Sequence, residues 1–370
     1  MVDWWQKGAQ DMEQKALIAM SGGVDSSVAA YLTKAAGYRC IGATMRLFDN
    51  ELLGQEQESS CCSLSDVEDA RSVAFRLGMP YYVLNFREEF TEKVIEKFAR
   101  AYEQGATPNP CIDCNRYLKF EALLARAQVL GCQWVVTGHY ARIVEENGQL
   151  LLKKAVDRAK DQSYFLYTLT REQLRHIRFP LGELSKEQAR EIAAQQGFLN
   201  ARKRDSQDIC FVPDGDYLAF LERYRRKSSR SGDFLDQSGR KIGTHRGAAG
   251  YTLGQRKGLG VALGQPVYVC GKDMVRNTVT LGPDEALYRR TLVAGDWNWL
   301  AIEPPREPLR CAAKTRSRQA EQPGWLSSAP DGRARFTFDE PQRAITPGQA
   351  VVLYEGDTVL GGGTIESTQD

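Results

Sequence analysis

Short apolar runs alternate with amphipathic segments through the first 140 residues of the chain. Four runs have the length and the Ile, Val, Ala and Tyr content of buried β-strands, and they lie at 16–20, 40–45, 81–86 and 134–138. The segments between them carry apolar residues at helical spacing, as Tyr117, Phe120 and Leu124 do within 116–131. This alternation predicts a parallel sheet covered by helices on both faces, with ligands bound outside the carboxyl ends of the strands.

The pattern changes twice further along the chain. Asn147-Gly148 lies between two strand-like runs and predicts a hairpin, and in the mostly helical stretch that follows Ser185 and Gln188 predict a capping box. From about 232 onward, short β-branched segments alternate with Gly, Pro, Asn and Asp turns, which predicts a small β-barrel. The chain is too long for one ordinary core. We predict a doubly wound parallel-sheet domain at 12–165, a small helical central domain at 166–231 and a C-terminal β-barrel at 232–370.

The composition is that of a globular protein, and it leaves nucleic-acid binding to local surfaces. Of the 370 residues, 42% are apolar and 26% are charged, and the formal net charge is only +2. The stretch 201–260 departs from this balance, because its 13 Lys and Arg exceed its 7 Asp and Glu by 6. A solvated face and a phosphate-binding face explain such a stretch equally well.

Sorting signals and cysteine usage both indicate the cytoplasm. The first residues lack the apolar segment of a secretory signal, and no run reaches the roughly 18 apolar residues of a membrane span. The nine cysteines are odd in number and irregularly spaced. In a long chain this is typical of a reducing compartment, where cysteines serve metals or catalysis more often than scaffolding.

The first predicted strand runs directly into SGGVDSS, Ser21 to Ser27, and then into a helix. Gly22 and Gly23 permit positive φ angles and close backbone approach, so the N–H groups of the loop and of the helix N-terminus can face a phosphate. The loop lacks the Lys of a Walker A motif and the G-x-G-x-x-G of a dinucleotide fold. A plain glycine-rich turn is the alternative, but the Ser and Asp side chains of the loop favour the phosphate site.

Two cysteines three positions apart lie in NPCIDCN, Asn109 to Asn115. Such a pair serves as a redox couple, as half of a zinc site, as cluster ligands, or as a nucleophile with a helper. The local sequence does not separate these uses of Cys111 and Cys114.

Further strings identify a family. Six strings follow SGGVDSS along the chain. In order, they are CCS (61–63), TPNPCIDCN (107–115), TGHYAR (137–142), KDQSYFL (160–166), DSQDICF (205–211) and GYTLGQRKGLG (250–260). Together they resemble the bacterial tRNA 2-thiouridylases, members of the ATP pyrophosphatase superfamily, over nearly the whole chain. The resemblance implies an adenine nucleotide alpha hydrolase-like first domain. It also implies ATP-dependent 2-thiolation of the wobble uridine of tRNA, through adenylation of the C2 oxygen.

The resemblance assigns residues to the nucleotide and to the tRNA. The residues expected at ATP are Ala19, Met20, Ser21, Gly22, Gly23, Val24, Asp25, Ser26, Met45 and Gly138. Asp25 is also the candidate ligand of Mg²⁺ beside the triphosphate. The residues expected at the tRNA are Asn109, Pro110, Cys111, His139, Lys160, Asp161, Gln162, Arg316, Ser317 and Gln349. The family usually has an aromatic residue where this chain has Ser317, so the side chain that would stack on a base is missing. His139 taken alone would be a structural histidine, and only its string favours a tRNA contact.

The catalytic residues implied by the resemblance are Cys114 and Cys210. In the family pattern Asn-Pro-Asp-x-x-Cys, Cys114 is the attacking or resolving thiol and Cys210 carries a persulfide, and cations at 202–204 would activate the thiolates. This chain has Cys111 in place of the aspartate, which makes Cys111 a third candidate. Three thiolates can hold a [4Fe–4S] cluster with one open iron, or zinc, so the cluster, persulfide/disulfide and zinc routes all remain open.

The expected partners are tRNA, with Lys, Glu and Gln acceptors implied by the family, and a sulfur-donor or sulfur-relay protein. One rival function is an ATP-dependent amide-forming ligase with the same loop, which would need neither the cysteine pair nor Cys210. Another is a non-catalytic RNA-binding sulfur carrier, which would not need the ATP loop. Cys61 and Cys62 lie in a family string without an assigned chemical role, and the N-terminal dozen residues carry no prediction of function.

Overall fold

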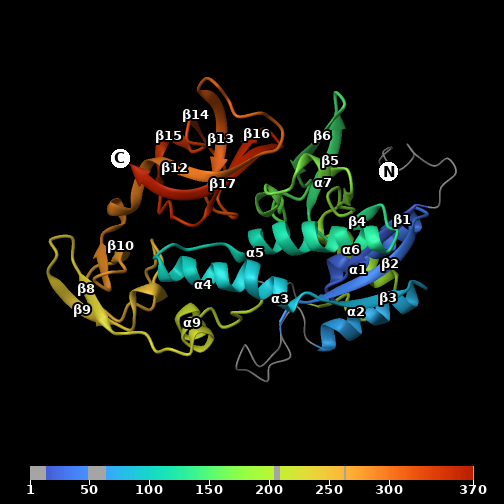
Figure 1. Ribbon diagram of the computed structural model, residues 1–370, viewed down its shortest axis with the longest axis horizontal. Helices are drawn as coiled ribbons and strands as arrows, with labels where there is room; N and C mark the ends of the chain where they lie inside the picture. The colour runs from blue at the N-terminus through green and yellow to red at the C-terminus, as the bar shows by residue number, and fades with distance from the viewer. Residues whose placement is uncertain (1–13, 49–63, 204–208, 262–263, 370) are drawn as a thin grey trace. The chain divides into compact units, whose positions relative to one another are not determined.

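The computed structural model describes residues 14–48, 64–203, 209–261 and 264–369 (Figure 1). The chain forms two compact units. The first contains the described residues up to 91 and those from 112 to 211, and the second contains those from 92 to 111 and from 212 onward. Cys61 and Cys62, the N-terminal dozen and most of DSQDICF lie outside the described residues.

A five-stranded parallel sheet forms the centre of the first unit. Its strands are β1 (Lys15–Ala19), β2 (Arg39–Arg46), β3 (Tyr81–Asn85), β4 (Trp134–Val136) and β7 (Ile177–Arg178). Their order is β3-β2-β1-β4-β7, and every neighbouring pair is parallel. The four predicted strands are therefore confirmed. The fifth, β7, has only two residues, which is too short for a periodic signal in the sequence.

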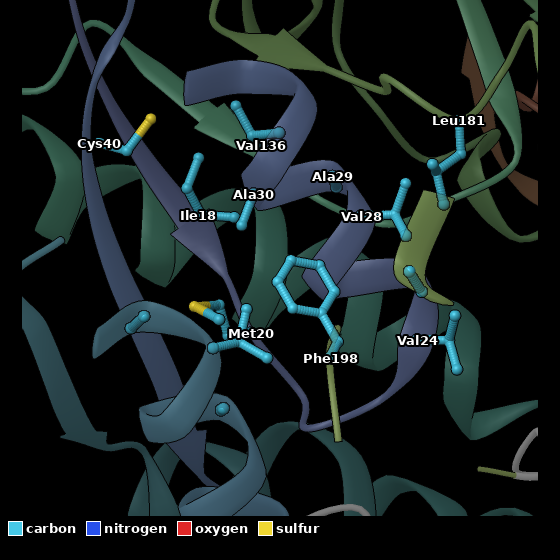
Figure 2. Packing of buried hydrophobic residues seen from close by; sticks show 14 of the residues in the cluster. Ile18, Met20, Val24, Val28, Ala29, Ala30, Cys40, Val136, Leu181 and Phe198 are labelled. Carbon is cyan, nitrogen blue, oxygen red and sulfur yellow. The ribbon is translucent and has the colours of Figure 1, made fainter. Parts of the chain in front are cut away.

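Helices of the first unit surround or extend from this sheet, and α1, α2, α6 and α7 contact its strands directly. The helices are α1 (Val24–Ala35), α2 (Leu64–Arg76), α3 (Arg87–Phe90), η4 (Cys114–Ala122), α6 (Leu123–Val129), η5 (Ser163–Leu166), α7 (Arg171–Leu174) and α8 (Lys186–Gln195). Figure 2 shows Val24 and Val28 of α1 in one buried cluster with Ile18 of β1 and Phe198. Burial of one such side chain contributes roughly 1.5–3 kcal/mol, so this cluster fixes α1, and the loop before it, on the sheet.

Two local predictions about the first unit are confirmed. The hairpin consists of β5 (Ala141–Glu146) and β6 (Gln149–Lys154), and its turn residues Asn147 and Gly148 have φ of +51° and +77°. Ser185 and Gln188 form the capping box of α8 through reciprocal hydrogen bonds of 3.2 and 2.8 Å.

However, α8 contacts α1, and β7 joins the parallel sheet. The helical stretch up to 211 thus packs within the first unit, because its apolar face is buried on α1.

The second unit contains two β structures. Its helices are α4 (Glu96–Glu103), η6 (Ala248–Gly250), α9 (Tyr217–Arg225) and η7 (Asp284–Leu287), and η3 (Thr91–Ile95) and α5 (Pro110–Asp113) lie at the joins between the units. A four-stranded sheet of order β10-β11-β8-β9 comprises β8 (Gly232–Leu235), β9 (Lys241–His245), β10 (Tyr268–Asp273) and β11 (Thr278–Gly282).

A separate barrel follows in the chain. It comprises β12 (Tyr288–Trp299), β13 (Leu309–Lys314), β14 (Gln322–Ser328), β15 (Ala334–Arg343), β16 (Ala350–Glu355) and β17 (Thr358–Gln369). The order β12-β15-β14-β13-β16-β17 closes through pairing of β12 with β17. The single barrel predicted from 232 onward is thus two β structures, because strand and turn signals do not reveal which strands share a sheet. No helix in the described ranges is long and apolar enough to cross a bilayer.

Candidate active site

The residues expected at ATP gather at the carboxyl edge of the parallel sheet. β2 and β3 lie on one side of β1 and β4 lies on the other, and ligands bind beyond the strand ends at such a switch point. Met45 lies near the end of β2, and Gly138 follows β4. A Cβ at Gly138 would lie 2.7 Å from the carbonyl carbon of Asp25 and from the nitrogen of Ser26. The structure therefore brings Gly138 directly against the start of α1.

The loop between β1 and α1 requires glycine at one position for two reasons. Gly22 has a φ of +73°, and a Cβ there would meet the carbonyl oxygen of Asp66 at 2.3 Å. Gly22 is buried, whereas Ser21 is exposed. The loop ends at the N-terminus of α1, where the helix dipole and the unpaired N–H groups favour an anion.

Hydrogen bonds hold the carbonyl groups of this loop. The side-chain amide of Asn200 donates to the carbonyl oxygen of Gly22 and to Ser27 Oγ, both at 2.9 Å. Ser26 Oγ and Ser27 Oγ each donate to the carbonyl oxygen of Gly23 at 3.0 Å. These donors occupy the negative ends of the peptide groups. The N–H group of Ser21 donates to Ser26 Oγ at 3.2 Å, and the other N–H groups of the loop can face an anion. Asn200 was not predicted, since it lies 178 positions from Gly22.

Asp25 is an ion-pair partner in this structure. Lys186 Nζ lies 2.8 and 2.9 Å from its two carboxylate oxygens, and Tyr140 Oη donates to it at 2.9 Å. Lys186 is only 4% exposed, so its charge is balanced by Asp25 at close range. This arrangement differs from the open carboxylate that a Mg²⁺ ligand requires. No local pattern pointed to Lys186, which looks like an ordinary lysine in the first turn of a helix.

NPCIDCN forms the start of a long helix. Asn109 Oδ1 accepts a hydrogen bond from the N–H of Cys111 at 3.2 Å, and Pro110 is the first residue of α5, where proline is favourable. The helix then widens into η4, which begins at Cys114, and such π-helical turns are frequent at functional sites. Cys111 is exposed and Cys114 is buried. The division between the two compact units falls directly after Cys111.

The segments that carry Cys114 and Cys210 both contact α3. Phe211, next to Cys210, packs edge-to-face on Phe90 of α3 with ring centroids 5.7 Å apart. The helix η4, which begins at Cys114, also contacts α3. Cys210 is half-buried. Two segments that are distant in sequence, each with a candidate cysteine, therefore pack on the same short helix.

The three candidate thiols have the ligand chemistry of a cluster or zinc site. Cys111, Cys114 and Cys210 are present as thiols. Within the part of the chain that the structure describes, no three His, Cys, Asp or Glu side chains are grouped so that they could hold a metal ion. Cys111 belongs to the second unit, whereas Cys114 and Cys210 belong to the first.

Of the cations predicted to activate the thiolates, Lys203 is paired with carboxylates of α2, and Arg204 lies outside the described residues. Lys203 Nζ lies 2.6 Å from a carboxylate oxygen of Asp66 and 2.6 Å from one of Asp69, both in α2. Partial burial lowers the pKa of Lys203, but its hydrogen bonds to the two carboxylates outweigh this and the pKa is raised. Its charge is therefore balanced by two carboxylates. This differs from the predicted role of activating a thiolate.

His139 lies half-buried against two aromatic rings that also contact each other. Its ring centroid is 5.8 Å from those of Phe120 and Phe179, and its Nδ1 is 2.7 Å from Thr137 Oγ1. Burial, with a smaller contribution from the charge of Lys119, holds the pKa of His139 well below its ordinary value. The imidazole is thus neutral at pH 7 and can contact a base by hydrogen bonding or stacking, but not as a cation.

Two of the other residues expected at the tRNA organise their own loop. Asp161 accepts hydrogen bonds from the N–H of Ala155 at 3.0 Å and from Ser163 Oγ at 2.8 Å. Gln162 Oε1 accepts one from the N–H of Tyr140 at 3.0 Å. The sequence pattern gave no sign of this internal use. Their contact with tRNA stays a prediction.

In the second unit, Arg316 and Gln349 also contact the backbone. Arg316, which is exposed, donates to the carbonyl oxygen of Ala344 at 3.0 Å and precedes the half-buried Ser317. The side-chain amide of Gln349 donates to the carbonyl oxygen of Thr107 at 2.8 Å, just before NPCIDCN. Gln349 thus fastens the entry to the cysteine motif onto the barrel.

Three protein-family models match successive parts of the chain. The model described as "tRNA methyl transferase HUP domain" matches residues 14–214, "tRNA methyl transferase PRC-barrel domain" matches 218–283, and "Aminomethyltransferase beta-barrel domain" matches 289–365. These ranges agree with a parallel-sheet domain followed by two β structures.

Full-length relatives are named tRNA-specific 2-thiouridylase MnmA. The relative from Moorella thermoacetica is 52% identical over 353 residues, which are 95% of this chain and 99% of the relative. The one from Symbiobacterium thermophilum is 50% identical over 365 residues, 97% of this chain and 94% of the relative. The one from Clostridioides difficile is 48% identical over 360 residues, 96% and 99% of the two chains. With three matching domains in one order and this identity from end to end, the chain belongs to the tRNA-specific 2-thiouridylase MnmA family.

Proposed function

We propose that this protein uses ATP to replace the C2 oxygen of the wobble uridine of tRNA with sulfur. The observation that carries the proposal is the pairing of two features in one unit. One is a glycine loop at a helix start whose Gly22 carbonyl is bound by Asn200, and the other is the packing of the segments that carry Cys114 and Cys210 on α3. The names of the full-length relatives support the same reaction.

Activation precedes sulfur transfer for a chemical reason. The C2 oxygen of uracil is a poor leaving group until an adenylyl group is attached to it. The N–H groups at the start of α1 would hold the departing pyrophosphate, so that the α-phosphorus faces the base. The base itself has to leave the anticodon stack, as enzymes that modify bases generally require. Asn109, Pro110 and His139 are the residues that we propose receive it.

Sulfur transfer follows from the chemistry of the two thiols. The terminal sulfur of a persulfide on Cys210 attacks C2, the bond from C2 to the adenylated oxygen breaks, and AMP leaves. The thiolate of Cys114 then attacks the sulfur of Cys210, their S–S bond forms, and the 2-thio group is released. A dithiol reductant must restore both thiols after each turnover.

A [4Fe–4S] cluster on Cys111, Cys114 and Cys210 is the second candidate source of sulfur. The substitution of Cys111 for the aspartate of the family pattern favours it. We derive no step from it, nor from zinc. We propose that Mg²⁺ enters on the phosphates of ATP, since this ion is usually held by one or two carboxylates plus phosphates.

The finer partners are also proposals. Lys, Glu and Gln acceptor tRNAs, a sulfur-donor or relay protein and a cytoplasmic location follow from the family resemblance. Lys160, Arg316 and the basic stretch at 201–260 are the candidate phosphate contacts.

The direct test is formation of 2-thiouridine in unmodified tRNA, followed by mass spectrometry, with pyrophosphate release measured in parallel. We expect Cys114→Ser and Cys210→Ser to abolish thiolation while pyrophosphate release persists. Cys270→Ser, a half-buried cysteine of the second unit, is the matched control. Normal thiolation by either site variant would rule out the role assigned to that thiol. Pyrophosphate release without tRNA would favour an amide-forming ligase, and no release at all would favour a sulfur carrier.

Iron and acid-labile sulfide, measured on protein purified without oxygen, distinguish the two sulfur sources. About four irons per chain, lost in Cys111→Ser, Cys114→Ser and Cys210→Ser alike, would establish the cluster. No iron, with a Cys114–Cys210 disulfide after turnover, would establish the persulfide route.

A further inference from the structure

The string GYTLGQRKGLG belongs to the family pattern but has no role in the reaction described above. Tyr251 and Leu259, near its two ends, are 8% and 7% exposed and lie in the buried apolar cluster of the four-stranded sheet. Between them, Arg256 and Lys257 are exposed. The residues 254–258, which we call the GQRKG loop, are therefore anchored at both ends and face the solvent in the middle.

Hydrogen bonds hold the backbone of the GQRKG loop. The N–H of Gly254 donates to the carbonyl oxygen of Val269 in β10 at 2.9 Å, and the N–H of Val269 donates to that of Gln255 at 3.0 Å. The side chain of Gln255 spans the turn. Its Oε1 accepts from the N–H of Thr252 at 3.1 Å, and its Nε2 donates to the carbonyl oxygen of Lys257 at 3.0 Å. The carbonyl groups of Gln255 and Lys257 are thus occupied by donors from within the same unit.

The two cations of the loop are not used within the described fold. The side chains of Arg256 and Lys257 make no ion pair and no hydrogen bond with another described residue. Their N–H groups and that of Gly258, which has a φ of +75°, also lack an acceptor in the described ranges. Peptide N–H groups in such a glycine turn can form a concave site for an anion.

Other cations of the basic stretch 201–260 are already balanced. At least five of its 13 Lys and Arg residues lie 2.6 to 3.6 Å from carboxylate oxygens. They are Lys203, Arg225, Arg240, Lys241 and Arg246. Because opposite charges at close range largely cancel at a distance, such pairs attract a phosphate weakly. The GQRKG loop, by contrast, combines unbalanced positive charge with available N–H groups.

Arg316 joins the start of the loop to the barrel. Its Nη2 lies 3.0 Å from the carbonyl oxygen of Ala344, 3.2 Å from Thr346 Oγ1 and 3.4 Å from the carbonyl oxygen of Leu253. The contact with the barrel is close, because a Cβ at Gly254 would lie 2.9 Å from the Cβ of Ala344. The guanidinium group of Arg316 therefore fixes where the loop begins.

We propose that the GQRKG loop binds the backbone of the tRNA, with Arg256 and Lys257 contacting phosphates and Arg316 positioning the loop. The proposal rests on the proposed function for the identity of the RNA, and it narrows the phosphate contacts named there to two side chains. The oxygens of a phosphodiester accept hydrogen bonds from guanidinium, ammonium and peptide N–H groups alike. Such contacts fix the position of an RNA without reading its sequence.

The slope of log K for tRNA binding against the logarithm of salt concentration counts the phosphate contacts. It is measured with unmodified tRNA by fluorescence anisotropy, from about 50 to about 200 mM salt. Arg256→Gln and Lys257→Gln should each lower the slope by about one, so that the fourfold rise in salt weakens binding about threefold less than in the wild type. Arg256→Lys, which keeps the charge, should retain the wild-type slope.

The matched control for the change in net charge is Arg240→Gln. Arg240 is also an exposed cation of the stretch, but its Nε lies 3.1 Å from a carboxylate oxygen of Asp236. It should leave the slope nearly unchanged.

Gly254→Ala tests the position of the loop without removing a charge. Gly254 has a φ of +81° and no space for a methyl group beside Ala344, so the substitution should displace the loop. We expect the slope to fall toward that of the double variant Arg256→Gln/Lys257→Gln. Gly239→Ala is the control, because Gly239 has a φ of +82° but nothing near its Cβ position, and it should keep the wild-type slope.

Arg316→Gln distinguishes a positioning role from a direct phosphate contact. A residue that acts through the loop lowers the slope of the wild type but hardly changes that of the double variant Arg256→Gln/Lys257→Gln. A loss of about one in both backgrounds would show that Arg316 contacts a phosphate itself, and would overturn its assignment as a positioning residue. Should Arg316→Gln or Gly254→Ala fail to fold, the variants at the two exposed cations decide the question alone.

A wild-type slope in both Arg256→Gln and Lys257→Gln would overturn the proposal. If these variants instead lost thiolation only when a sulfur-donor protein supplied the sulfur, the loop would belong to the interface with that protein. Failure of the proposed function has a different signature, since the wild type would form no 2-thiouridine while the salt slope still depended on the loop.

Discussion

Replacing Lys186 with Met removes one partner of the ion pair at the start of α1. Its Nζ lies 2.8 and 2.9 Å from the oxygens of Asp25, and the two side chains are 6% and 31% exposed. At an effective dielectric constant of about 20, the attraction at this distance is roughly 6 kcal/mol, from which desolvation subtracts a large part. Losing one partner of a buried pair costs roughly 3–5 kcal/mol. Because Asp25 is partly exposed and keeps Tyr140, we expect the lower end, about 3 kcal/mol.

Hydrogen exchange of the α1 amides measures this loss locally, which suits a chain with two compact units. The double variant Asp25→Asn/Lys186→Met should lose less protection than Lys186→Met alone, because it leaves no unbalanced charge. Lys34→Met, at an exposed lysine in the last turn of the same helix, is the control and should cost about 0.5 kcal/mol or less. ATP affinity, measured by calorimetry, should fall together with the protection of α1.

Equal losses of protection in the single and double variants would refute the reasoning. The two charges would then contribute independently to the stability of α1, and the charge of Asp25 would not be balanced by Lys186. A rise in ATP affinity in Lys186→Met would also contradict it, since this would mean that Lys186 holds Asp25 away from the nucleotide.

Three further predictions follow from single contacts. Gly22→Ala should abolish ATP binding or folding. Gly148 has a similar φ but open space around it, so Gly148→Ala should cost only about 1–2 kcal/mol in thermal unfolding. Equal effects of the two substitutions would show that backbone strain alone matters. Gln349→Ala should slow thiolation at saturating tRNA more than it weakens tRNA binding, because its amide is bonded to Thr107; a large change in Kd alone would indicate a direct tRNA contact. Burial lowers the pKa of His139, so as pH falls below about 6.5 the unfolded chain takes up this proton first and the folded state loses stability. The free energy of unfolding of the wild-type protein should then fall by up to about 1.4 kcal/mol per pH unit more than that of His139→Gln. Parallel curves of unfolding free energy against pH for the two proteins, from about pH 6.5 to 5, would contradict this.

The sequence predicted those parts of the fold and site that depend on neighbouring residues. The strand at 16–20, the glycine loop after it and the hairpin turn at Asn147-Gly148 are each encoded within a few positions, and the structure confirms them. The side chains that hold the loop could not be predicted from the sequence. Lys186 lies 161 positions from Asp25 and Asn200 lies 178 positions from Gly22. Nothing near either residue marks it, because a buried lysine at a helix start and a buried asparagine in a turn look like surface residues in a sequence.

The prediction that residues 232–370 form a single barrel was wrong for a related reason. Alternation and turn residues indicate strands, but hydrogen bonding between β12 and β17, at the two ends of the barrel sequence, decides where a barrel closes. The same limit applies to Gln349. The family resemblance suggested that Gln349 contacts the tRNA, whereas its side-chain amide donates to the carbonyl oxygen of Thr107, a residue 242 positions away.

Both unexpected contacts with the loop come from one stretch of chain, which begins at Lys186 and leads to Cys210. Lys186 reaches Asp25, and Asn200 reaches Gly22 and Ser27, so this stretch contacts both the first turn of α1 and the loop before it. An activated base is open to attack by water, and the thiol that must react with it has to be in place when activation occurs. A misplacement of about 1 Å can cost roughly 10²-fold in rate. Lys186 and Asn200 brace the helix start at which we expect ATP to bind, so a change at either residue should slow the activation step.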